Sequence, residues 1–353
     1  MAADVAFPTQ VQHNSPLDDP LLKQEWFAIA WSREVEPGKL LPRRLMGKDM
    51  VLWRSQEGLH CWRDLCVHRG ARLSLGAIRS GAPSSASAAY AGVRDCLVCP
   101  YHAWEYAPSG ECVRIPAHPE MTPPPKARVE TFHARERFGV VWVAFEEPLL
   151  PLPEFPIADS AGFRTLLAGP YRFRAQGPRV IENLLDVAHL GFVHAGLLDD
   201  PARGEIEDYT VTPGTTAQGP EAREIRIWQP DPDGTGMPAL VDYHYWVIGP
   251  LTGAFVKTDG ERRFGILAQV APIDEEYCES RLIMCLNYGD ETSDEDLLRF
   301  QDHVTEQDRI VVESQRPEFL PLDLQAELHL RSDRMAIAYR KWLRATGFTY
   351  GTA

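Results

Sequence analysis

CVHRGARLSLG (residues 66–76) and CPYHAW (residues 99–104) are the two stretches that decide how the first part of this 353-residue chain folds. Each begins with a cysteine and has a histidine two or three residues later, so together they offer two thiolates and two imidazoles. Gly70, Gly76 and Pro100 are typical of tight loops, which bring backbone N–H groups close to a bound metal centre. The pattern therefore predicts that both loops hold one metal group.

The donor set favours an iron–sulfur cluster of a particular kind. Four cysteines usually hold a [2Fe–2S] cluster, and replacing two of them by histidines on one iron gives a Rieske centre. We therefore expect Cys66 and Cys99 to bind one iron and His68 and His102 to bind the other. A structural zinc site with two cysteines and two histidines is the alternative. The order Cys-x-His then Cys-x2-His, with Arg69 and Gly70 after the first box and Trp104 after the second, favours the cluster.

A second group of metal-ligand types follows, with Asn183, Asp186, His189 and His194 spaced N-x2-D-x2-H-x4-H. Two histidines and one carboxylate form the facial triad of a mononuclear non-haem iron that binds O₂. On a regular helix, five residues turn a side chain by about 140°, so the two histidines would not face one ion. We expect a local break in the helix, for which Gly191 is the candidate position.

The carboxylate of this triad is expected on a late helix over residues 294–315. Asp308 shares a helix face with apolar residues at the spacing i, i+4, i+7, which places it in an apolar stripe. A carboxylate in such a stripe needs a positive partner, and a metal ion would serve. The periodicity favours Asp308 but leaves the other acidic residues of the helix open. The candidates are Asp302, Glu306, Asp308 and Glu313.

Composition and charge exclude several classes of protein. The net charge of −14 disfavours nucleic acid as a partner, because such a surface repels phosphate backbones. No apolar run reaches the length of a membrane span, and the N-terminus lacks the pattern of a secretory signal. We therefore expect a cytoplasmic protein without a membrane partner. Seven cysteines cannot all pair in disulfides, and in a cytoplasmic protein those in paired boxes are expected to be metal ligands.

The chain divides into three parts by its pattern of turns and periodic segments. We expect an N-terminal arm over residues 1–20, a β domain with the metal boxes over 21–148, and a catalytic domain over 149–353. The small-residue stretch Ser80–Gly92 is predicted to be a surface loop. The expected helices are 180–194 (interrupted), 294–315 and 324–343, and the expected antiparallel strands are 221–228, 241–247, 263–270 and 280–288.

As a set, these motifs resemble those of the Rieske non-haem iron oxygenases. The matching pieces are the two Cys–His boxes, NLLDVAH (183–189) with His194, and EQDRIVVESQ (306–315). Further pieces, YRKWL (339–343) among them, resemble the homotrimeric monooxygenase and demethylase subgroup. That subgroup includes dicamba, vanillate and caffeine demethylases and hydroxylases of saxitoxin biosynthesis. The resemblance covers residues 26–343.

The resemblance implies an α+β fold: an N-terminal Rieske β-sandwich [2Fe–2S] domain and a C-terminal helix-grip (START-like) antiparallel-sheet catalytic domain. It implies a head-to-tail homotrimer, in which Asp186 links His102 of one subunit to His189 of its neighbour. It makes Asp308 the third iron ligand and places Asn183 close to the iron. Two departures stand out, namely the long interval between the boxes and Ala103, where the family usually has glycine.

The function implied is that of the catalytic (alpha) subunit of an oxygenase. It would use O₂ and outside electrons to hydroxylate or demethylate an aromatic, heterocyclic or alkaloid-like small molecule. The chain has no Gly-x-Gly-x-x-Gly fingerprint, so electrons from NAD(P)H must arrive through a separate reductase and, in some systems, a ferredoxin. The alternatives are a cis-dihydroxylating dioxygenase or, without catalysis, an electron carrier or zinc-binding module.

The substrate pocket is the hardest part to predict. Aromatic and apolar residues of the second half would suit a flat substrate, but each would also suit the core of a sheet. The candidates for substrate binding are Trp228, Tyr243, Tyr245, Leu251, Phe255 and Phe264.

Overall fold

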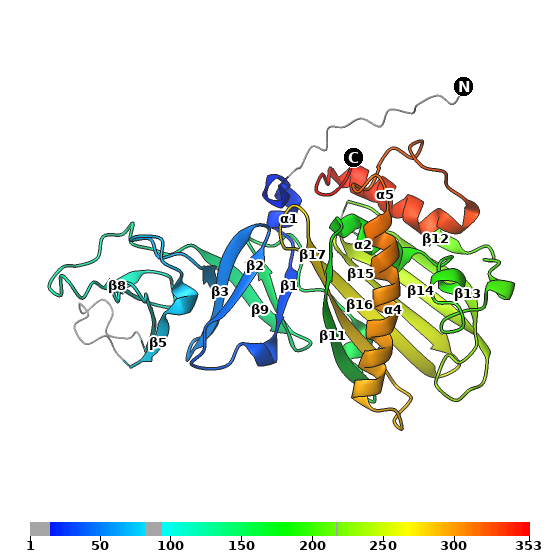
Figure 1. Cartoon of the computed structure of the whole chain (residues 1–353), viewed down its shortest axis with the longest axis horizontal. Helices are drawn as coiled ribbons and strands as arrows, with labels where there is room; N and C mark the ends of the chain where they lie inside the picture. The colour runs from blue at the N-terminus through cyan, green and yellow to red at the C-terminus, as the bar shows by residue number, and fades with distance from the viewer. Residues whose placement is uncertain (1–14, 82–93, 217) are drawn as a thin grey trace.

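The computed structural model describes residues 15–81, 94–216 and 218–353. Most of the predicted arm over residues 1–20, and most of the predicted loop over 80–92, lie outside the described residues. The molecule is elongated, with two sheets at one end and a larger sheet at the other (Figure 1).

The first domain is built around a six-stranded antiparallel sheet in the order β1-β10-β9-β4-β3-β2. Strands β1 and β10 are buried along their whole length, which explains their continuous apolar sequences. The strands of this sheet are β1 (Phe27–Trp31), β2 (Leu41–Leu45), β3 (Lys48–Ser55), β4 (Gly58–Arg63), β9 (Thr131–Arg137) and β10 (Val140–Ala144).

A smaller four-stranded sheet carries the two metal-binding loops. Its core is continuous with side chains of β3 and β4, because Trp53 and Trp62 pack in one cluster with Leu97 and Tyr106. The two sheets thus form the predicted β-sandwich. The strands of the small sheet, in spatial order, are β5 (Ala77–Ser80), β6 (Asp95–Val98), β7 (Glu105–Tyr106) and β8 (Cys112–Arg114).

The second domain is a seven-stranded antiparallel sheet with a long helix, α4 (Asp294–Ser314), lying across it (Figure 1). The sheet order is β11-β17-β16-β15-β14-β13-β12. Its strands are β11 (Arg164–Phe173), β12 (Thr210–Thr212), β13 (Glu221–Gln229), β14 (Ala239–Gly249), β15 (Thr252–Asp259), β16 (Arg262–Pro272) and β17 (Cys278–Leu286). The other helices are α1 (Pro20–Lys23), α2 (Gly177–Leu185), α3 (Leu190–Val193) and α5 (Arg334–Thr346).

This arrangement confirms the α+β class and the helix-grip architecture of the second domain. Two helix predictions need correction. The predicted helix over 324–343 begins only at Arg334. The helix over 180–194 is interrupted, as predicted, but it ends at Leu185 and Gly191 lies inside α3.

The two domains are joined by specific hydrogen bonds as well as by a shared apolar core. The backbone N–H of Ala28 donates to Gln269 Oε1 at 2.9 Å, and Arg281 donates to the Ala28 carbonyl at 3.1 Å. Met46 N–H donates to the Pro272 carbonyl at 2.8 Å. None of the seven cysteines, all of which lie in the described ranges, is in a disulfide. No helix in the described part of the chain is long and apolar enough to cross a membrane.

Candidate active site

The two Cys–His boxes lie on neighbouring loops of the small sheet. The loop after β4 is closed by the Gly70 N–H, which donates to the Cys66 carbonyl at 2.9 Å. The loop between β6 and β7 is closed in the same way by the Ala103 N–H, which donates to the Cys99 carbonyl at 3.1 Å. Each loop therefore presents its cysteine and histidine from a compact, internally bonded turn.

Ala103 has a backbone φ of 54°, in the left-handed region that glycine adopts without strain. The departure at this position therefore has a physical consequence, because a β-carbon in this region costs about 1–2 kcal/mol. Gly70, in the corresponding place of the other loop, has a φ of 72°. The two loops therefore have the same left-handed backbone conformation at this place. It is unstrained at Gly70 and strained at Ala103.

The four side chains are arranged with sulfur inside and nitrogen outside. Cys66 and Cys99 are 2% and 3% exposed, whereas His102 is exposed and His68 partly so. The two imidazole rings lie 4.7 Å apart between centroids, and His68 stacks on Trp104 at 4.5 Å. This order is what a [2Fe–2S] group needs if the histidine-bound iron faces the surface.

The local polar groups fit such a cluster. The Cys66 thiol lies 3.1 Å from the Tyr106 hydroxyl, and the Cys99 thiol lies beside it, close to the backbone N–H groups of Tyr101 and His102. Burial, together with the Cys66 thiol, raises the pKa of Cys99 above that of a free thiol. Two adjacent buried thiols with donors aimed at them are favourable as thiolates only when a metal offsets their charge.

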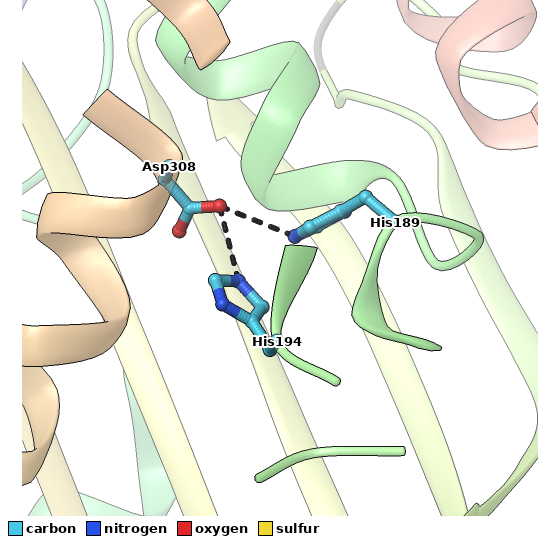
Figure 2. A group of neighbouring side chains, drawn as sticks. All are labelled: His189, His194 and Asp308. Atoms are coloured by element: carbon cyan, nitrogen blue, oxygen red, sulfur yellow. Dashed lines mark ion pairs between the residues drawn. The ribbon is translucent and has the colours of Figure 1, made fainter. Parts of the chain in front are cut away.

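The second group converges between α2–α3 and α4 (Figure 2). Nε2 of His194 lies 3.0 Å from Asp308 Oδ1, and Nε2 of His189 lies 3.4 Å from the same oxygen. One donor atom from each of the three residues lies within 4.8 Å of the others. Two imidazoles and a carboxylate facing one point are the donor set of a mononuclear iron, so the residues fit that group.

The break between α2 and α3 is what allows both histidines to face Asp308. Asp186 leaves helical geometry with ψ of 131°, so the chain turns before His189 and starts a new helix at Leu190. Gly191 has a different role from the one predicted. A β-carbon there would lie 3.2 Å from Asp199 Oδ2, so glycine permits close packing rather than a break.

Neighbouring side chains hold the two imidazoles in place. His194 Nδ1 donates to Gln307 Oε1 at 2.8 Å, which leaves Nε2 as the free lone pair towards Asp308. His189 Nδ1 faces Asp186 Oδ2 at 3.3 Å. Burial opposes ionisation of Asp186, but the His189 side chain and the backbone N–H groups of Ala188 and His189 together hold the Asp186 pKa below its ordinary value. Each ring is therefore oriented by the nitrogen that does not face Asp308.

The other acidic candidates of α4 are engaged elsewhere. Asp302 accepts a hydrogen bond from the Tyr171 hydroxyl at 2.7 Å, and Glu306 pairs with Arg309. Glu313 accepts from the Arg174 N–H at 2.9 Å. Asn183 donates to Asp308 Oδ1 at 3.3 Å, so it lies beside the triad. The sequence did not point to Gln307 as a partner of His194. It lies next to Asp308 in the chain, and neighbouring residues of a regular helix lie on different faces.

A cavity of about 440 Å³ opens beside the triad, and His189, His194 and Asp308 form part of its wall. Most of the remaining wall is apolar. Four of the six predicted pocket residues line it, namely Tyr243, Tyr245, Phe255 and Phe264.

Trp228 and Leu251 do not line the cavity, which corrects the predicted pocket. Leu251 is fully buried in the main core, and Trp228 lies under the guanidinium of Arg203, 4.6 Å from its ring centroid. Two polar residues that the sequence did not single out, Gln229 and Lys257, do line it.

Comparison with known proteins agrees with this geometry. Residues 25–133 match the model of the Rieske [2Fe-2S] domain, and residues 173–347 match the vanillate O-demethylase oxygenase C-terminal domain. Each of the two metal sites thus lies within a matched region.

The similar proteins are oxygenase components. Methylxanthine N1-demethylase NdmA of Pseudomonas putida is 29% identical over 335 residues, covering 92% of this chain and 88% of that protein. Probable methylxanthine N7-demethylase NdmC of Pseudomonas sp. (strain TJI-51) is 33% identical over 224 residues, covering 61% and 77%. The structure of P. putida CBB5 NdmA with caffeine aligns with a TM-score of 0.77 at 27% identity, covering 94% of this chain and 92% of that one. The chain therefore belongs to the Rieske non-haem iron oxygenases, as a catalytic alpha chain of the demethylase subgroup.

Proposed function

We propose that this oxygenase inserts one oxygen atom into a C–H bond of a small aromatic or heterocyclic molecule. Where the carbon is a methyl group on nitrogen or oxygen, the hydroxylated product loses formaldehyde, and the net reaction is demethylation. The observation that carries this proposal is the convergence of His189, His194 and Asp308 on the wall of a largely apolar cavity.

When bound, the cluster supplies single electrons and the mononuclear iron supplies the activation of dioxygen. The residues that would hold the two groups are Cys66, His68, Cys99 and His102 for the cluster, and His189, His194 and Asp308 for the iron.

The remaining residues of the site have positioning roles. Gln307 contacts Nδ1 of His194, and Asp186 faces Nδ1 of His189. Each contact orients its ring so that Nε2 faces the position of the iron. Tyr243 and Tyr245 stack with their ring centroids 5.6 Å apart and their planes 14° from parallel, and they give the cavity a flat aromatic wall. Such a wall suits a planar ring and excludes water from the position of the reacting carbon.

We further propose a head-to-tail homotrimer, in which Asp186 links His189 to His102 of the neighbouring subunit. The shape of the chain supports this, because the small sheet and the α4-covered sheet lie at opposite ends of the molecule (Figure 1). Apolar side chains are exposed near both sites, including Leu75 at 72% and Leu328 at 88%. A particle mass three times that of the 39.7 kDa chain by light scattering is the expected result.

A separate reductase is the proposed electron source, with NAD(P)H as the ultimate donor and a ferredoxin as a further candidate. The cytoplasmic location stays a prediction.

Metal analysis and turnover with labelled dioxygen test the function directly. We expect three irons per chain, a Rieske-type EPR signal on reduction, and one labelled oxygen atom in the first product. Two labelled atoms on adjacent ring carbons would instead identify the cis-dihydroxylation. A protein that binds zinc, or that carries a cluster but no third iron, would be the electron carrier or zinc-binding module, and the proposal would fail.

A further inference from the structure

One strand of the cavity wall carries a cation. Lys257 on β15 lines the cavity, and its ammonium group lies over the Phe264 ring at 5.4 Å from the centroid. It donates to two neutral acceptors, Gln229 Oε1 at 3.0 Å and the Pro232 carbonyl at 2.8 Å. An ammonium group has three N–H donors, so one remains without a partner in the described part of the protein.

The charge of Lys257 is not neutralised by a direct ion pair within the described residues, since none of their carboxylates lies within 4.0 Å of it. Burial lowers the pKa of Lys257 to about 8, against the weaker opposing effect of three aspartates. Those aspartates have other partners. Asp233 pairs with Arg262, which also faces Asp259 at 3.9 Å, and Asp231 accepts from the Gly236 N–H at 2.9 Å.

Gln229 fixes the direction of this cation. Its amide nitrogen donates to the Leu198 carbonyl at 3.0 Å and to the Tyr243 hydroxyl at 2.9 Å, so its oxygen must face Lys257. Gln229 is 1% exposed, and Leu198 follows His194 by four residues in the segment that carries the iron-site histidines. The lysine is therefore held in a defined position within the same cavity as the triad.

We propose that Lys257 binds a carboxylate on the substrate, so that this oxygenase acts on an aromatic acid rather than on a neutral heterocycle. Asp231 and Asp233 also line this part of the otherwise largely apolar cavity, but no ion pair joins either carboxylate to the Lys257 ammonium in the described structure. A buried cation without a contacting anion is unfavourable, and a substrate carboxylate would take its remaining N–H in a charge-assisted hydrogen bond. The inference rests on the proposed function, because it takes the cavity beside the triad as the substrate site.

The test uses matched probes of different charge. Methoxybenzoates in ortho, meta and para forms, and the matching neutral methoxybenzamides, are titrated calorimetrically into the anaerobic iron-loaded protein at neutral pH. For at least one isomer, the acid is expected to bind at least about tenfold more tightly than its amide, the worth of one charge-assisted hydrogen bond.

Two variants separate recognition from simple support of the loop over residues 230–238. Lys257→Met removes the cation at similar length and is expected to abolish the preference for the acid. Thr235→Val is the matched control, because the Thr235 hydroxyl supports the same loop by donating to Asp233 Oδ1, at 2.7 Å, but carries no charge and does not line the cavity. The preference should survive in this control.

The wild-type protein would overturn the inference by showing no preference for any acid, whether both probe series bind equally or neither binds. Retention of the preference in Lys257→Met, or its loss in Thr235→Val, would also overturn it. Failure of the proposed function has a different signature. The acid preference would then be present as described, while the reduced protein with its reductase would form no product from dioxygen.

Discussion

At the scale of single residues, the site depends on side chains that do not bind metal themselves. Asp186 faces His189 Nδ1 at 3.3 Å and also accepts a hydrogen bond from the Ala188 N–H at 3.0 Å. The carboxylate is thereby held in one orientation. Asp186 lines the cavity and also a second depression on the other side of the break, beside Val311 and Leu328. In the proposed homotrimer, this position would let Asp186 link His189 to the neighbouring subunit.

Asp186→Asn tests this role. The variant keeps an oxygen for the Ala188 N–H but loses the negative charge beside His189, so both metal sites should stay loaded. We expect turnover to fall by about 10- to 100-fold, the usual effect of removing a group that orients a metal-bound histidine. Metal content and steady-state turnover with the reductase measure the two quantities.

The control for this variant is Asp302→Asn, which changes an aspartate of α4 that bonds Tyr171 instead of the triad. Its turnover should match that of the wild type. Wild-type turnover in Asp186→Asn would remove the proposed role of Asp186.

At the scale of elements, helix α2 is held by a buried network of charges. Arg340 on α5 donates to both carboxylate oxygens of Glu182, at 2.5 and 2.8 Å, and to Glu327 at 2.6 Å. Arg179 pairs with the same Glu327 at 2.8 Å. Arg179 and Arg340 are each 3% exposed. This network fixes the helix that carries Asn183 and leads into Asp186.

Arg340→Met is predicted to destabilise the catalytic domain by about 3 kcal/mol, because it leaves Glu182 as a buried charge without its main partner. Urea unfolding followed by circular dichroism measures the effect. The added substitution Glu182→Gln should restore part of the loss, since it removes the orphaned charge.

Arg299→Met provides the comparison on a surface pair. Arg299 pairs with Glu295 at 2.9 Å, but its side chain is 65% exposed, so little change in stability is expected. Equal losses in Arg340→Met and Arg299→Met would show that burial of the network is not what stabilises α2.

At the scale of the whole molecule, the two domains meet through groups that titrate. Glu25, just before β1, accepts from the Leu251 N–H and the Thr252 hydroxyl of the catalytic domain, at 3.3 Å each. Its second carboxylate oxygen is buried without a partner in the described structure. Burial, with a smaller effect of Asp19, raises the pKa of Glu25 to about 8.

The folded protein therefore binds a proton at Glu25 more tightly than the unfolded chain does. Between pH 4.5 and about 8, unfolding releases that proton, so the contribution of Glu25 to stability is present at low pH and is lost as the pH rises. Glu25→Gln keeps the shape but not the titration. We predict that the variant gains stability relative to the wild type by a few kcal/mol from pH 5 to pH 8.

Urea unfolding of both proteins across this pH range measures the difference. Glu36→Gln, an exposed residue paired with Lys39, is the control and should give a difference that does not vary with pH. A constant difference for Glu25→Gln as well would mean that Glu25 is ionised in the folded protein.

Local patterns of the sequence are enough to identify much of this protein. The Cys–His boxes predict an iron–sulfur cluster, and the N-x2-D-x2-H-x4-H spacing predicts a mononuclear iron site. Both patterns are readable because the ligand types lie within a few residues of each other. Helix α4 was predicted to within one residue, because its apolar periodicity is regular, and in the structure Ser293 caps its start. Strand β11 was not predicted, because Gly169 and Pro170 lie inside it and are unusual within a strand.

Other properties are decided only by contacts between distant segments. Periodicity favoured Asp308 over its neighbours, but packing of α4 against the broken helix is what brings it to the histidines. The alternation of β14 places Tyr243 on one face without saying what lies opposite. The roles of Gln229 and Lys257 likewise appear only once their strands line a cavity. Sequence periodicity predicts which face of its own helix or strand a side chain lies on. The residue that it contacts is decided by the tertiary fold, because those contacts join residues far apart in the chain.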